Sequence, residues 1–400
     1  MVTALLLENI HPLAAETLTA AGVEVRTRPG AMTEDELLAA LPGIDVLGIR
    51  SNTTVTDRVL AAAPDHLRAV GAFCIGTNQI DLAAATRHGV VCFNAPFSNT
   101  RSVVELVICE IIALARRLTE KTEQMHAGIW SKSAAGSHEV RGRTLGIVGY
   151  GNIGSQLSVI AEALGMRVYF YDVSDKLALG NAVRCASLEE LLAVAETVTL
   201  HVDGRAGNAG IFGEEQFARM RPRALFLNLS RGFVVDYASL QRHVESGHIA
   251  GAAVDVFPKE PKKKGETFES ELRGLPNVIL TPHVGGSTQE AQEDIGLFVS
   301  GKLRDYLADG TSTLSVNLPA VSGPTSGYTD RVALLHRNIP GVLAKVNSVL
   351  ADHGLNIVGQ SLSTRGEFGY VLTDTSGFSA EALEALRTLP ETVRLAQFRR

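Results

Sequence analysis

Residues 144–172 read TLGIVGYGNIGSQLSVIAEALGMRVYFYD, and this stretch decides the fold. Its first five residues, Thr144–Val148, form a continuous apolar run that is typical of a buried parallel strand. A glycine-rich turn comes next, and Ser155–Leu164 then has the pattern of a helix. A second apolar run, Arg167–Tyr171, ends at Asp172. The order strand, glycine turn, helix, strand and acid predicts the first βαβ unit of a Rossmann-type domain.

The three glycines of the turn, Gly149, Gly151 and Gly154, have the spacing GxGxxG. The first permits a tight turn, the second lets backbone amides approach a pyrophosphate, and the third allows the helix to pack closely on the strand. The helix N-terminus then faces the anion. Asp172 is placed to bind both ribose hydroxyls and to repel a 2′-phosphate, so the motif predicts NAD rather than NADP as the cofactor.

Beyond this stretch, short apolar runs alternate with helical patterns along two blocks of the chain. Such alternation predicts βαβ units and parallel sheets. Residues 99–125 and 290–309 have apolar positions at helical spacing and read as two long helices. The last seventy or so residues follow a different order, βαββαβ, which is ferredoxin-like.

The composition argues against several classes of function. A formal charge of −6 disfavours a general nucleic-acid binder, although a few local arginines still suit a small anionic substrate. The N-terminus has no signal pattern, and the most apolar helical stretch, residues 103–115, contains Glu105 and Glu110 and is too short to span a membrane. The four cysteines form no CxxC pair. We therefore expect buried free thiols, no metal site, no membrane partner and a cytoplasmic location.

Three polar residues come a few positions after predicted strands of the second block, at the edge where ligands bind to parallel sheets. They are Arg231, Glu260 and His283. Oxidation of a secondary alcohol requires a base that takes the hydroxyl proton while hydride leaves the carbon, and histidine suits that task. We predict His283 as the acid/base, Glu260 as the carboxylate that orients its ring, and Arg231 as the clamp for a substrate carboxylate.

These residues give the chain a resemblance to the D-isomer-specific 2-hydroxyacid dehydrogenase family. In particular it is similar to the short bacterial members of that family that act on 3-phosphoglycerate. The similarity runs almost the whole length of the chain, and in that family the residues matched by Arg231, Glu260 and His283 are catalytic. The matching segments are Phe73–Asn78, Asn94–Ser102, Gly149–Gly154, Asn228–Gly232, Ala253–Phe257 and Thr281–Gln289.

The resemblance implies an α/β fold in which a Rossmann-type NAD domain is inserted in a flavodoxin-like split substrate domain. A ferredoxin-like ACT regulatory domain follows at the C-terminus. Substrate would lie in a cleft that closes and excludes water. The implied boundaries are 1–98 and 287–320 for the substrate domain, 99–286 for the NAD domain, 321–328 for a linker and 329–400 for the ACT domain.

The resemblance also implies sets of ligand-binding residues. The set for NAD is Gly149, Gly151, Asn152, Ile153, Gly154, Asp172, Leu229, Ser230, Asp255, Gly285 and Gly286. The set for the 3-phosphoglycerate substrate is Arg50, Ser51, Gly76, Thr77, Asn99 and Lys132. In relatives the residue matched by Lys132 can reach a neighbouring subunit's site. Two positions depart from the family pattern. Asn52 stands where a second arginine is often found, which leaves one cation fewer for a phosphate, and Asp203 stands where proline is usual, beside the adenosine pocket.

The ACT-like segment matches effector-binding positions with His336, Asn338 and Asn356. The resemblance implies that these residues bind an amino acid, L-serine, at an interface between two such domains. A domain that only dimerises is the alternative. The resemblance also implies a homotetramer and a place at the first step of phosphorylated L-serine biosynthesis.

Two other functions remain open from the sequence. One is an NAD-dependent reductase of hydroxypyruvate, glyoxylate or 2-oxoglutarate, which Arg50, Ser51 and the ACT-like tail disfavour. The other is a non-catalytic NAD-sensing scaffold, which the set Arg231, Glu260 and His283 disfavours.

Overall fold

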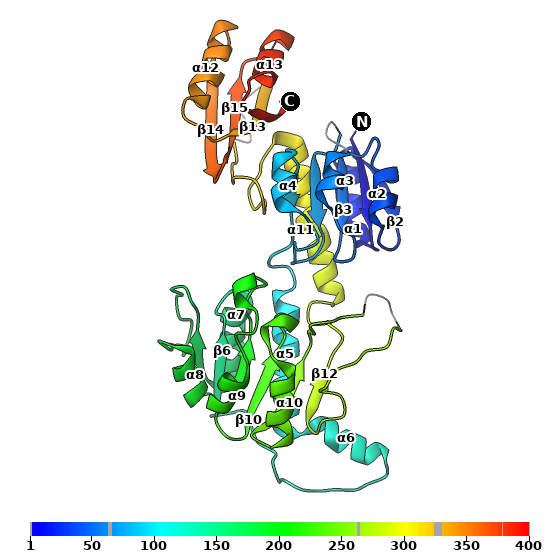
Figure 1. Cartoon of the computed structure of the whole chain (residues 1–400), viewed down its shortest axis with the longest axis vertical. Coiled ribbons are helices and arrows are strands. Elements are labelled where there is room, and N and C mark those ends of the chain that lie inside the picture. The colour runs from blue at the N-terminus through cyan, green and yellow to red at the C-terminus, as the bar shows by residue number, and fades with distance from the viewer. Residues whose placement is uncertain (1, 63–65, 262–264, 324–329, 378, 400) are drawn as a thin grey trace. The chain divides into compact units, whose positions relative to one another are not determined.

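The computed structural model describes residues 2–62, 66–261, 265–323, 330–377 and 379–399. These residues divide into two compact units (Figure 1). One unit, here called the nucleotide unit, is Asn99–Ala291, and the other consists of Met1–Ser98 with Gln292–Arg400. Most of the predicted linker, residues 324–328, lies outside the described residues, and the domain boundaries stay a prediction.

The nucleotide unit is built on a seven-stranded sheet with the order β12-β11-β10-β9-β6-β7-β8, in which all neighbouring strands are parallel. Its central strands are buried along their length, as the continuous apolar runs in the sequence predict for a sheet covered on both faces. The strands are β6 (Thr144–Val148), β7 (Arg167–Tyr171), β8 (Val183–Arg184), β9 (Thr197–Leu200), β10 (Ala224–Asn228), β11 (Ile249–Val254) and β12 (Val278–Leu280). The helices are α5 (Thr100–Arg116), α6 (Leu118–His126), α7 (Asn152–Ala163), α8 (Leu188–Val194), α9 (Glu214–Arg219) and α10 (Tyr237–Glu245), with short 3-10 turns η1 (Ala206–Asn208) and η2 (Gly232–Val234).

The single long helix expected over residues 99–125 is wrong, because the structure has two helices, α5 and α6, there. They are separated by Arg117, whose backbone is left-handed with φ 51°. A left-handed residue ends the helical hydrogen-bond ladder, so the second helix starts in a new direction. The guanidinium of Arg117 then pairs with Glu120 at 2.5 Å on the first turn of α6, which ties the break in place.

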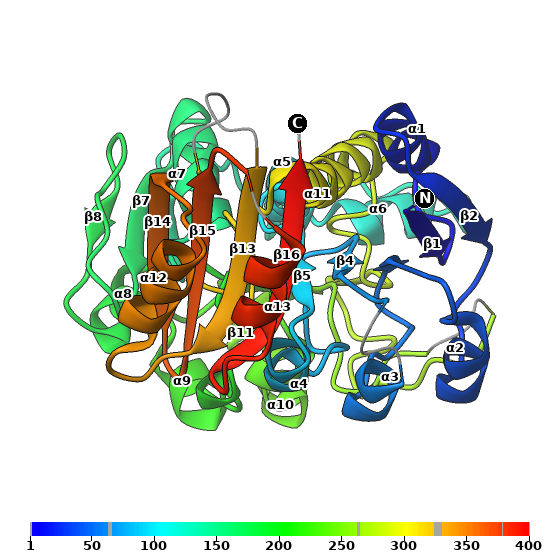
Figure 2. The same ribbon diagram turned by 90° about the horizontal axis from the view of Figure 1, so that it is seen from above.

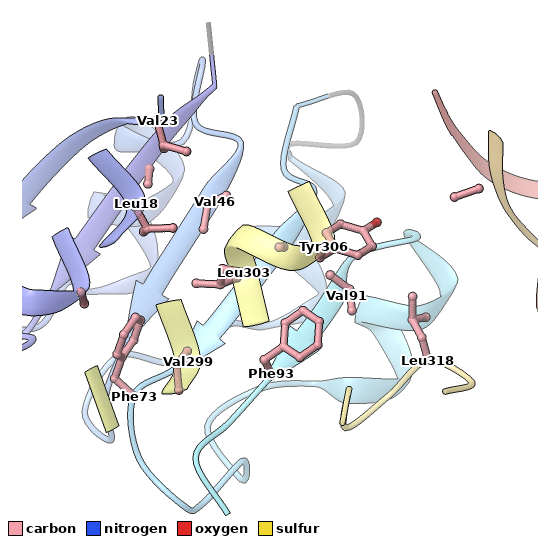
Figure 3. Packing of buried hydrophobic residues seen from close by; sticks show 14 of the residues in the cluster. Leu18, Val23, Val46, Phe73, Val91, Phe93, Val299, Leu303, Tyr306 and Leu318 are labelled. Atoms are coloured by element: carbon pink, nitrogen blue, oxygen red, sulfur yellow. The ribbon is translucent and has the colours of Figure 1, made fainter. Parts of the chain in front are cut away.

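The other unit begins with a five-stranded parallel sheet in the order β2-β1-β3-β4-β5, the flavodoxin-like order that the resemblance implies. Helix α11 (Gln289–Asp309) places Val299, Leu303 and Tyr306 in one buried cluster with Phe73 and Phe93 of the sheet region (Figure 3). The strands are β1 (Thr3–Leu7), β2 (Glu24–Arg28), β3 (Val46–Ile49), β4 (Ala69–Ala72) and β5 (Val91–Phe93), and the other helices are α1 (Pro12–Ala20), α2 (Glu34–Ala40), α3 (Asp57–Ala61) and α4 (Leu82–Arg87).

The C-terminal segment of this unit is an antiparallel four-stranded sheet in the order β14-β15-β13-β16. Two helices lie against one face of that sheet (Figure 2), and their apolar side chains share a core with Val332, Leu334 and Val371. The elements run in the predicted ferredoxin-like order: β13 (Asp330–Arg337), α12 (Val342–Asp352), β14 (Ile357–Arg365), β15 (Phe368–Thr375), α13 (Ala380–Arg387) and β16 (Thr392–Arg399).

The four cysteines are free, but their predicted burial is only half right. Cys92 and Cys185 are buried, Cys74 is half-buried and Cys109 is exposed on α5. The apolar neighbours of Cys109 in sequence misled the prediction, because they lie on other faces of the helix. In the part of the chain that the structure describes, no helix is long and apolar enough to cross a membrane.

Candidate active site

The glycine turn joins β6 to α7, and its three glycines meet different surroundings. Gly149 has a left-handed backbone with φ 93°, and a Cβ there would lie 2.6 Å from the carbonyl oxygen of His201. A Cβ on Gly154 would lie 2.3 Å from the carbonyl oxygen of Gly149. Both glycines are therefore required by the fold itself. Around Gly151 nothing lies within 4 Å of such a Cβ, and the start of α7 has no side-chain cap. That end of the helix is free to receive a pyrophosphate.

Asp172 lies directly after β7, and its carboxylate is held in place by the backbone. Oδ2 accepts the N–H of Tyr150 at 2.8 Å, and Oδ1 accepts the N–H and hydroxyl of Ser174 at 2.9 and 2.8 Å. Burial acts to raise the pKa of Asp172, but the hydrogen bonds from Ser174 and Tyr150 outweigh it and lower the pKa. The group is therefore a fixed anion at neutral pH, beside the glycine turn. These features fit an NAD molecule bound by its pyrophosphate and ribose.

The loop after β10 carries Arg231, and buried Asn228 organises it. The side-chain oxygen of Asn228 accepts the N–H and hydroxyl of Ser230 at 3.0 and 2.7 Å. Its amide nitrogen donates to the carbonyl of Arg231 at 3.1 Å and to the hydroxyl of Tyr237 at 2.9 Å. Gly232 is needed here, since a Cβ would lie 2.0 Å from the backbone of Phe257. Arg231 itself is half-buried, and its Nη1 donates to the carbonyl of Ser230 at 2.7 Å.

His283 and Glu260 lie together, as the sequence expects. Nδ1 of His283 is 2.8 Å from Oε2 of Glu260, and Oε1 of Glu260 accepts the backbone N–H of Phe257 at 3.0 Å. The hydrogen bond to Glu260 raises the pKa of His283, against the opposing effects of burial and the Arg231 charge. Burial acts to raise the pKa of Glu260, yet the bonds from His283 and Phe257 and the charges of His283 and Arg231 lower it. The pair thus holds an ionised carboxylate against a ring that gains a proton readily, within reach of the Arg231 charge.

The segment that carries His283, residues 281–285, is anchored on Asp255, and we call it the strap. Oδ1 of Asp255 accepts the Thr281 hydroxyl at 2.6 Å and the Val284 N–H at 2.8 Å, while Oδ2 accepts the Gly285 N–H at 2.8 Å. His283 has φ 54°, a left-handed conformation that is uncommon outside glycine, and its N–H bonds to the Asp255 carbonyl at 2.9 Å. Asp255 therefore fixes the position from which the His283 ring reaches its partner.

The other residues predicted for ligands in this unit lie in several places. Asn152 and Ile153 form the first turn of α7, Leu229 is buried after β10, and a Cβ on Gly286 would lie 2.1 Å from Asn99. The buried Oδ1 of Asn99 has no hydrogen-bond partner among the described residues. Lys132 is exposed in the segment between α6 and β6. The roles of these residues stay predictions.

The residues predicted to bind the substrate phosphate lie in the other unit, after β3. Arg50 is half-buried and Ser51 is exposed. Their loop is held by the buried carboxylate of Glu8, which accepts the N–H groups of Arg50, Asn52 and Thr53 at 3.1, 3.0 and 2.9 Å. Sequence reasoning missed Glu8 because it lies some forty positions away, at the end of β1.

Gly76 and Thr77 lie on the half-buried loop after β4. Two buried amides hold this loop: Gln79 donates to the carbonyls of Arg50 and Gly76 at 2.7 and 3.2 Å, and Asn94 donates to the carbonyl of Ile75 at 2.6 Å. The bond from Gln79 to Arg50 links the loop after β4 to the loop after β3 within the same unit.

The predicted effector residues of the C-terminal domain differ in exposure. His336 is buried, its Nδ1 lies 2.9 Å from the carbonyl of Arg337, and its buried Nε2 has no partner among the described residues. Asn338 donates to the carbonyl of Gly366 at 3.1 Å, and Asn356 is exposed. The open nitrogen of His336 is compatible with an effector, whose contact there stays a prediction.

Sequence reasoning missed two further residues that build the site. Asn228 and Tyr237 form a buried chain of hydrogen bonds, since the Tyr237 hydroxyl donates to the carbonyl of Val256 at 2.6 Å. The chain links the Arg231 loop to the segment that leads to Glu260. A polar residue at the end of an otherwise apolar strand, as Asn228 is, was the available signal.

Comparisons with known proteins show the family to which the chain belongs. Residues 108–285 match the model of the D-isomer specific 2-hydroxyacid dehydrogenase NAD binding domain, and residues 332–394 match that of an AHAS small subunit-like ACT domain. Fold and site thus define an NAD-dependent oxidoreductase with a C-terminal ACT domain. D-3-phosphoglycerate dehydrogenase of Escherichia coli (strain K12) is 46% identical over 394 residues, which cover 98% of this chain and 96% of that protein. The enzyme of the same name from Dictyostelium discoideum is 46% identical over 391 residues, covering 98% and 95%. The chain belongs to the D-3-phosphoglycerate dehydrogenase family.

Solved structures support the same fold. The TT0316 protein from Thermus thermophilus has a TM-score of 0.68 and 28% identity, covering 76% of this chain and 97% of that one. A glyoxylate reductase from Paecilomyes thermophila has a TM-score of 0.69 and 25% identity, covering 79% and 98%. The fold alone therefore does not select the substrate.

Proposed function

We propose that the chain oxidises D-3-phosphoglycerate to 3-phosphohydroxypyruvate with NAD, the first step of phosphorylated L-serine synthesis. The observation that carries this proposal is the 2.8 Å contact between His283 and Glu260, close to Arg231 and in the same unit as the glycine turn. Relatives named D-3-phosphoglycerate dehydrogenase, matched over nearly the whole chain, supply the choice of substrate.

The reaction needs a base, an orienting anion and a cation. NAD, when bound, supplies the acceptor for the hydride that leaves C2 of the substrate. Neutral His283 takes the proton of the C2 hydroxyl through Nε2, because Nδ1 faces Glu260. The imidazolium that forms is stabilised by the Glu260 carboxylate. Arg231 binds the substrate carboxylate and polarises the C2 oxygen, so charge is balanced as the carbonyl forms.

Further roles rest on the family resemblance. Arg50 and Ser51 would bind the substrate phosphate, and the backbone of Gly76 and Thr77 would bind its carboxylate. Asn99 and Lys132 would complete the substrate contacts. NAD would contact Asn152, Ile153, Leu229, Ser230, Asp255, Gly285 and Gly286 besides the glycine turn and Asp172.

A reductase of unphosphorylated 2-keto acids is the second candidate, because Asn52 leaves Arg50 without the second cation that relatives often have. Rates of NADH oxidation with 3-phosphohydroxypyruvate and with hydroxypyruvate, measured side by side, separate the two. We expect a strong preference for the phosphorylated substrate. Arg50→Gln should raise KM for it by about 10- to 100-fold, the effect of losing a charged hydrogen bond, with little change for hydroxypyruvate.

Arg26→Gln is the matched control, because Arg26 is an exposed arginine of the same unit that pairs only with Glu24 among the described residues. Equal rates with both substrates in the wild type would reject the phosphate-specific proposal and favour the general reductase.

We also propose that L-serine inhibits the enzyme through the ACT domain, that the active form is a homotetramer and that it works in the cytoplasm. The ACT match and the open Nε2 of His336 support the effector site. Asn356→Ala, an exposed change that spares the core, should weaken inhibition by serine and leave the uninhibited rate unchanged. If saturating serine alters neither rate nor substrate affinity in the wild type, the regulatory proposal fails.

A further inference from the structure

The end of the seven-stranded sheet opposite the glycine turn carries a cationic hollow. Arg143 precedes β6, Arg223 precedes β10 and Asn277 precedes β12, whereas the glycine turn and His283 follow strands of the same parallel sheet. Five polar residues line a hollow of about 20 Å³ at this end of the sheet. They are Arg117, His138, Arg143, Arg223 and Asn277. The active-site residues of the unit are therefore at one end of the sheet and the hollow is at the other. We call it the arginine hollow.

Four separate segments bring the cations together. A Cβ on Gly136 would lie 3.5 Å from Nη1 of Arg117 and 3.8 Å from Nη2 of Arg223, so both guanidinium groups lie against this glycine. The segment with Gly136 is fixed to the end of α5, since the N–H of His138 donates to the carbonyl of Ala115 at 2.8 Å. The guanidinium groups of Arg117 and Arg223 therefore both lie beside Gly136 in the lining of the hollow.

The carboxylates around the hollow leave positive charge uncompensated. Arg117 pairs with Glu120 at 2.5 Å, and Arg143 approaches Glu196 at 3.4 Å. Arg223 has no carboxylate within ion-pair distance in the described part of the chain. Three guanidinium groups therefore face two carboxylates.

A buried donor in the hollow also lacks an acceptor. Nε of Arg143 is buried and has no hydrogen-bond partner among the described residues. A buried N–H on a charged group is costly when it is unpaired, so an acceptor from outside the chain is expected there. Gly136, His138 and Arg223 of its lining are exposed, which gives a ligand access from solvent.

The hollow has space for the acceptor. About 20 Å³ has room for one oxygen atom or water. A tetrahedral oxyanion is able to insert one oxygen and keep the others at the rim, beside Arg117 and Arg223. The hollow also contains an acceptor, because the buried Oδ1 of Asn277 has no partner among the described residues while its amide nitrogen donates to the carbonyls of Leu114 and Ala250. A monohydrogen phosphate carries both acceptors for the arginines and one O–H for Asn277.

We propose that the arginine hollow binds a phosphate group, as inorganic phosphate or as the end of a phosphomonoester. This site is separate from the substrate site and does not depend on the proposed function. Its ligand ties the end of α5 to the starts of β6 and β10, so binding stabilises the nucleotide unit by mass action.

The test removes Arg223, the arginine of the hollow that has no carboxylate within ion-pair distance among the described residues. In an Arg50→Gln background, which weakens the proposed phosphate contact of the substrate site, inorganic phosphate should raise Tm by about 2–4 °C over sodium chloride of equal ionic strength. Arg223→Gln should abolish that rise, because it removes a rim cation and keeps a long side chain. Arg221→Gln, an exposed arginine two positions away, should retain it. An equal rise in both variants, or no rise in the background protein, overturns the proposal.

Crystals of the wild-type protein give a second measurement that needs no variant. Arsenate has the shape and protonation of phosphate, and arsenic scatters anomalously. Crystals soaked in arsenate should show an anomalous peak beside Nε of Arg143 and Nη2 of Arg223. Absence of a peak there, in crystals whose active site binds arsenate, also overturns the proposal.

Discussion

Two carboxylates at the carboxyl end of the nucleotide sheet and two polar side chains at its amino end differ in the hydrogen bonds that the chain gives them. At the carboxyl end, Asp172 and Asp255 each accept three hydrogen bonds from the chain itself. At the amino end, Nε of Arg143 and Oδ1 of Asn277 are buried without partners in the part of the chain that the structure describes. Polar groups whose hydrogen bonds are all made by the chain fix the shape of the chain. A buried donor and a buried acceptor that lack partners in one hollow indicate a ligand instead.

The difference also explains how the catalytic pair is placed. The strap holds His283 in a left-handed conformation, which costs free energy, and the bonds to Asp255 offset that cost. The ring is thereby fixed before substrate arrives. Preorganisation of this kind is expected of a base that must meet one particular hydroxyl.

The largest effect is expected from His283→Asn, which tests whether the carboxyl end is the reacting end. Asparagine tolerates the left-handed backbone, so the strap should keep its shape while the base is lost. We expect kcat to fall by about 10²–10⁴-fold, the usual contribution of a general base. NADH affinity, measured by fluorescence titration, should stay unchanged. Full activity in this variant would favour the scaffold over the enzyme.

Glu260→Gln removes the anion beside His283 and should alter the pH profile. The hydrogen bond to Glu260 raises the pKa of His283, and oxidation of the alcohol requires the neutral ring. Oxidation by the wild type therefore declines as the pH falls below that pKa, and in the variant this decline should move to lower pH. Measuring kcat/KM against pH in both directions checks the sign, because reduction requires the protonated ring. An unmoved profile would mean that Glu260 does not contact the ring that titrates.

Asp255→Asn should weaken the strap and lower the stability of the fold. Asparagine keeps one acceptor oxygen, so at least one of the bonds to Thr281, Val284 and Gly285 is lost and the charge is removed. We expect a loss of about 2–4 kcal/mol in the free energy of unfolding, measured by urea titration. Thr281→Val, which removes one bond, should cost about 1 kcal/mol. If both variants lose the same free energy of unfolding, Asp255 does not anchor the strap as a unit.

Much of the carboxyl end could be predicted from the sequence because its signals are local. Thr144–Val148, the glycine spacing and Asp172 lie within thirty positions, and each residue type has one strong physical reason. The Glu260–His283 pair was expected from two strand ends, since parallel strands bring such ends together.

The amino end and the supporting contacts could not be predicted in this way. The arginine hollow needs Arg117, Gly136, Arg143, Arg223 and Asn277, which are spread over 160 positions and follow no pattern. The hollow also depends on the break between α5 and α6, where the helical periodicity of the sequence continues across a left-handed residue.

Helix α5 gives the clearest case of a signal that sequence cannot resolve. Glu105 and Glu110 both interrupt its apolar run and look equivalent in the sequence. In the structure the Glu105 side chain is 62% exposed and pairs with Arg101, whereas Glu110 is buried. Only tertiary packing decides which glutamate faces the sheet.

Glu110 sharpens the comparison, because its carboxyl group accepts no hydrogen bond from the described part of the chain although it lies close to Asp255, which accepts three. Neither of its oxygens has a hydrogen-bond partner among the described residues. Burial, and secondly the charge of Asp255, raise the pKa of Glu110 to about 8. The side chain is therefore protonated at neutral pH, unlike the hydrogen-bonded carboxylate of Asp172.

Glu110→Gln should change the dependence of stability on pH. Between its ordinary pKa of 4.5 and about 8, the folded chain keeps the Glu110 proton and the unfolded chain loses it. Wild-type stability should consequently fall as the pH rises through this window, by at most about 1.4 kcal/mol per pH unit from this group. Glutamine does not titrate, so this loss should be absent in the variant. The free energy of unfolding of the variant, measured by urea titration with circular dichroism, should therefore rise relative to that of the wild type from about pH 5.5 to 7.5. Glu105→Gln, on the exposed side of α5, should show no such rise. Parallel slopes for all three proteins would mean that Glu110 is ionised in the fold and has found a donor.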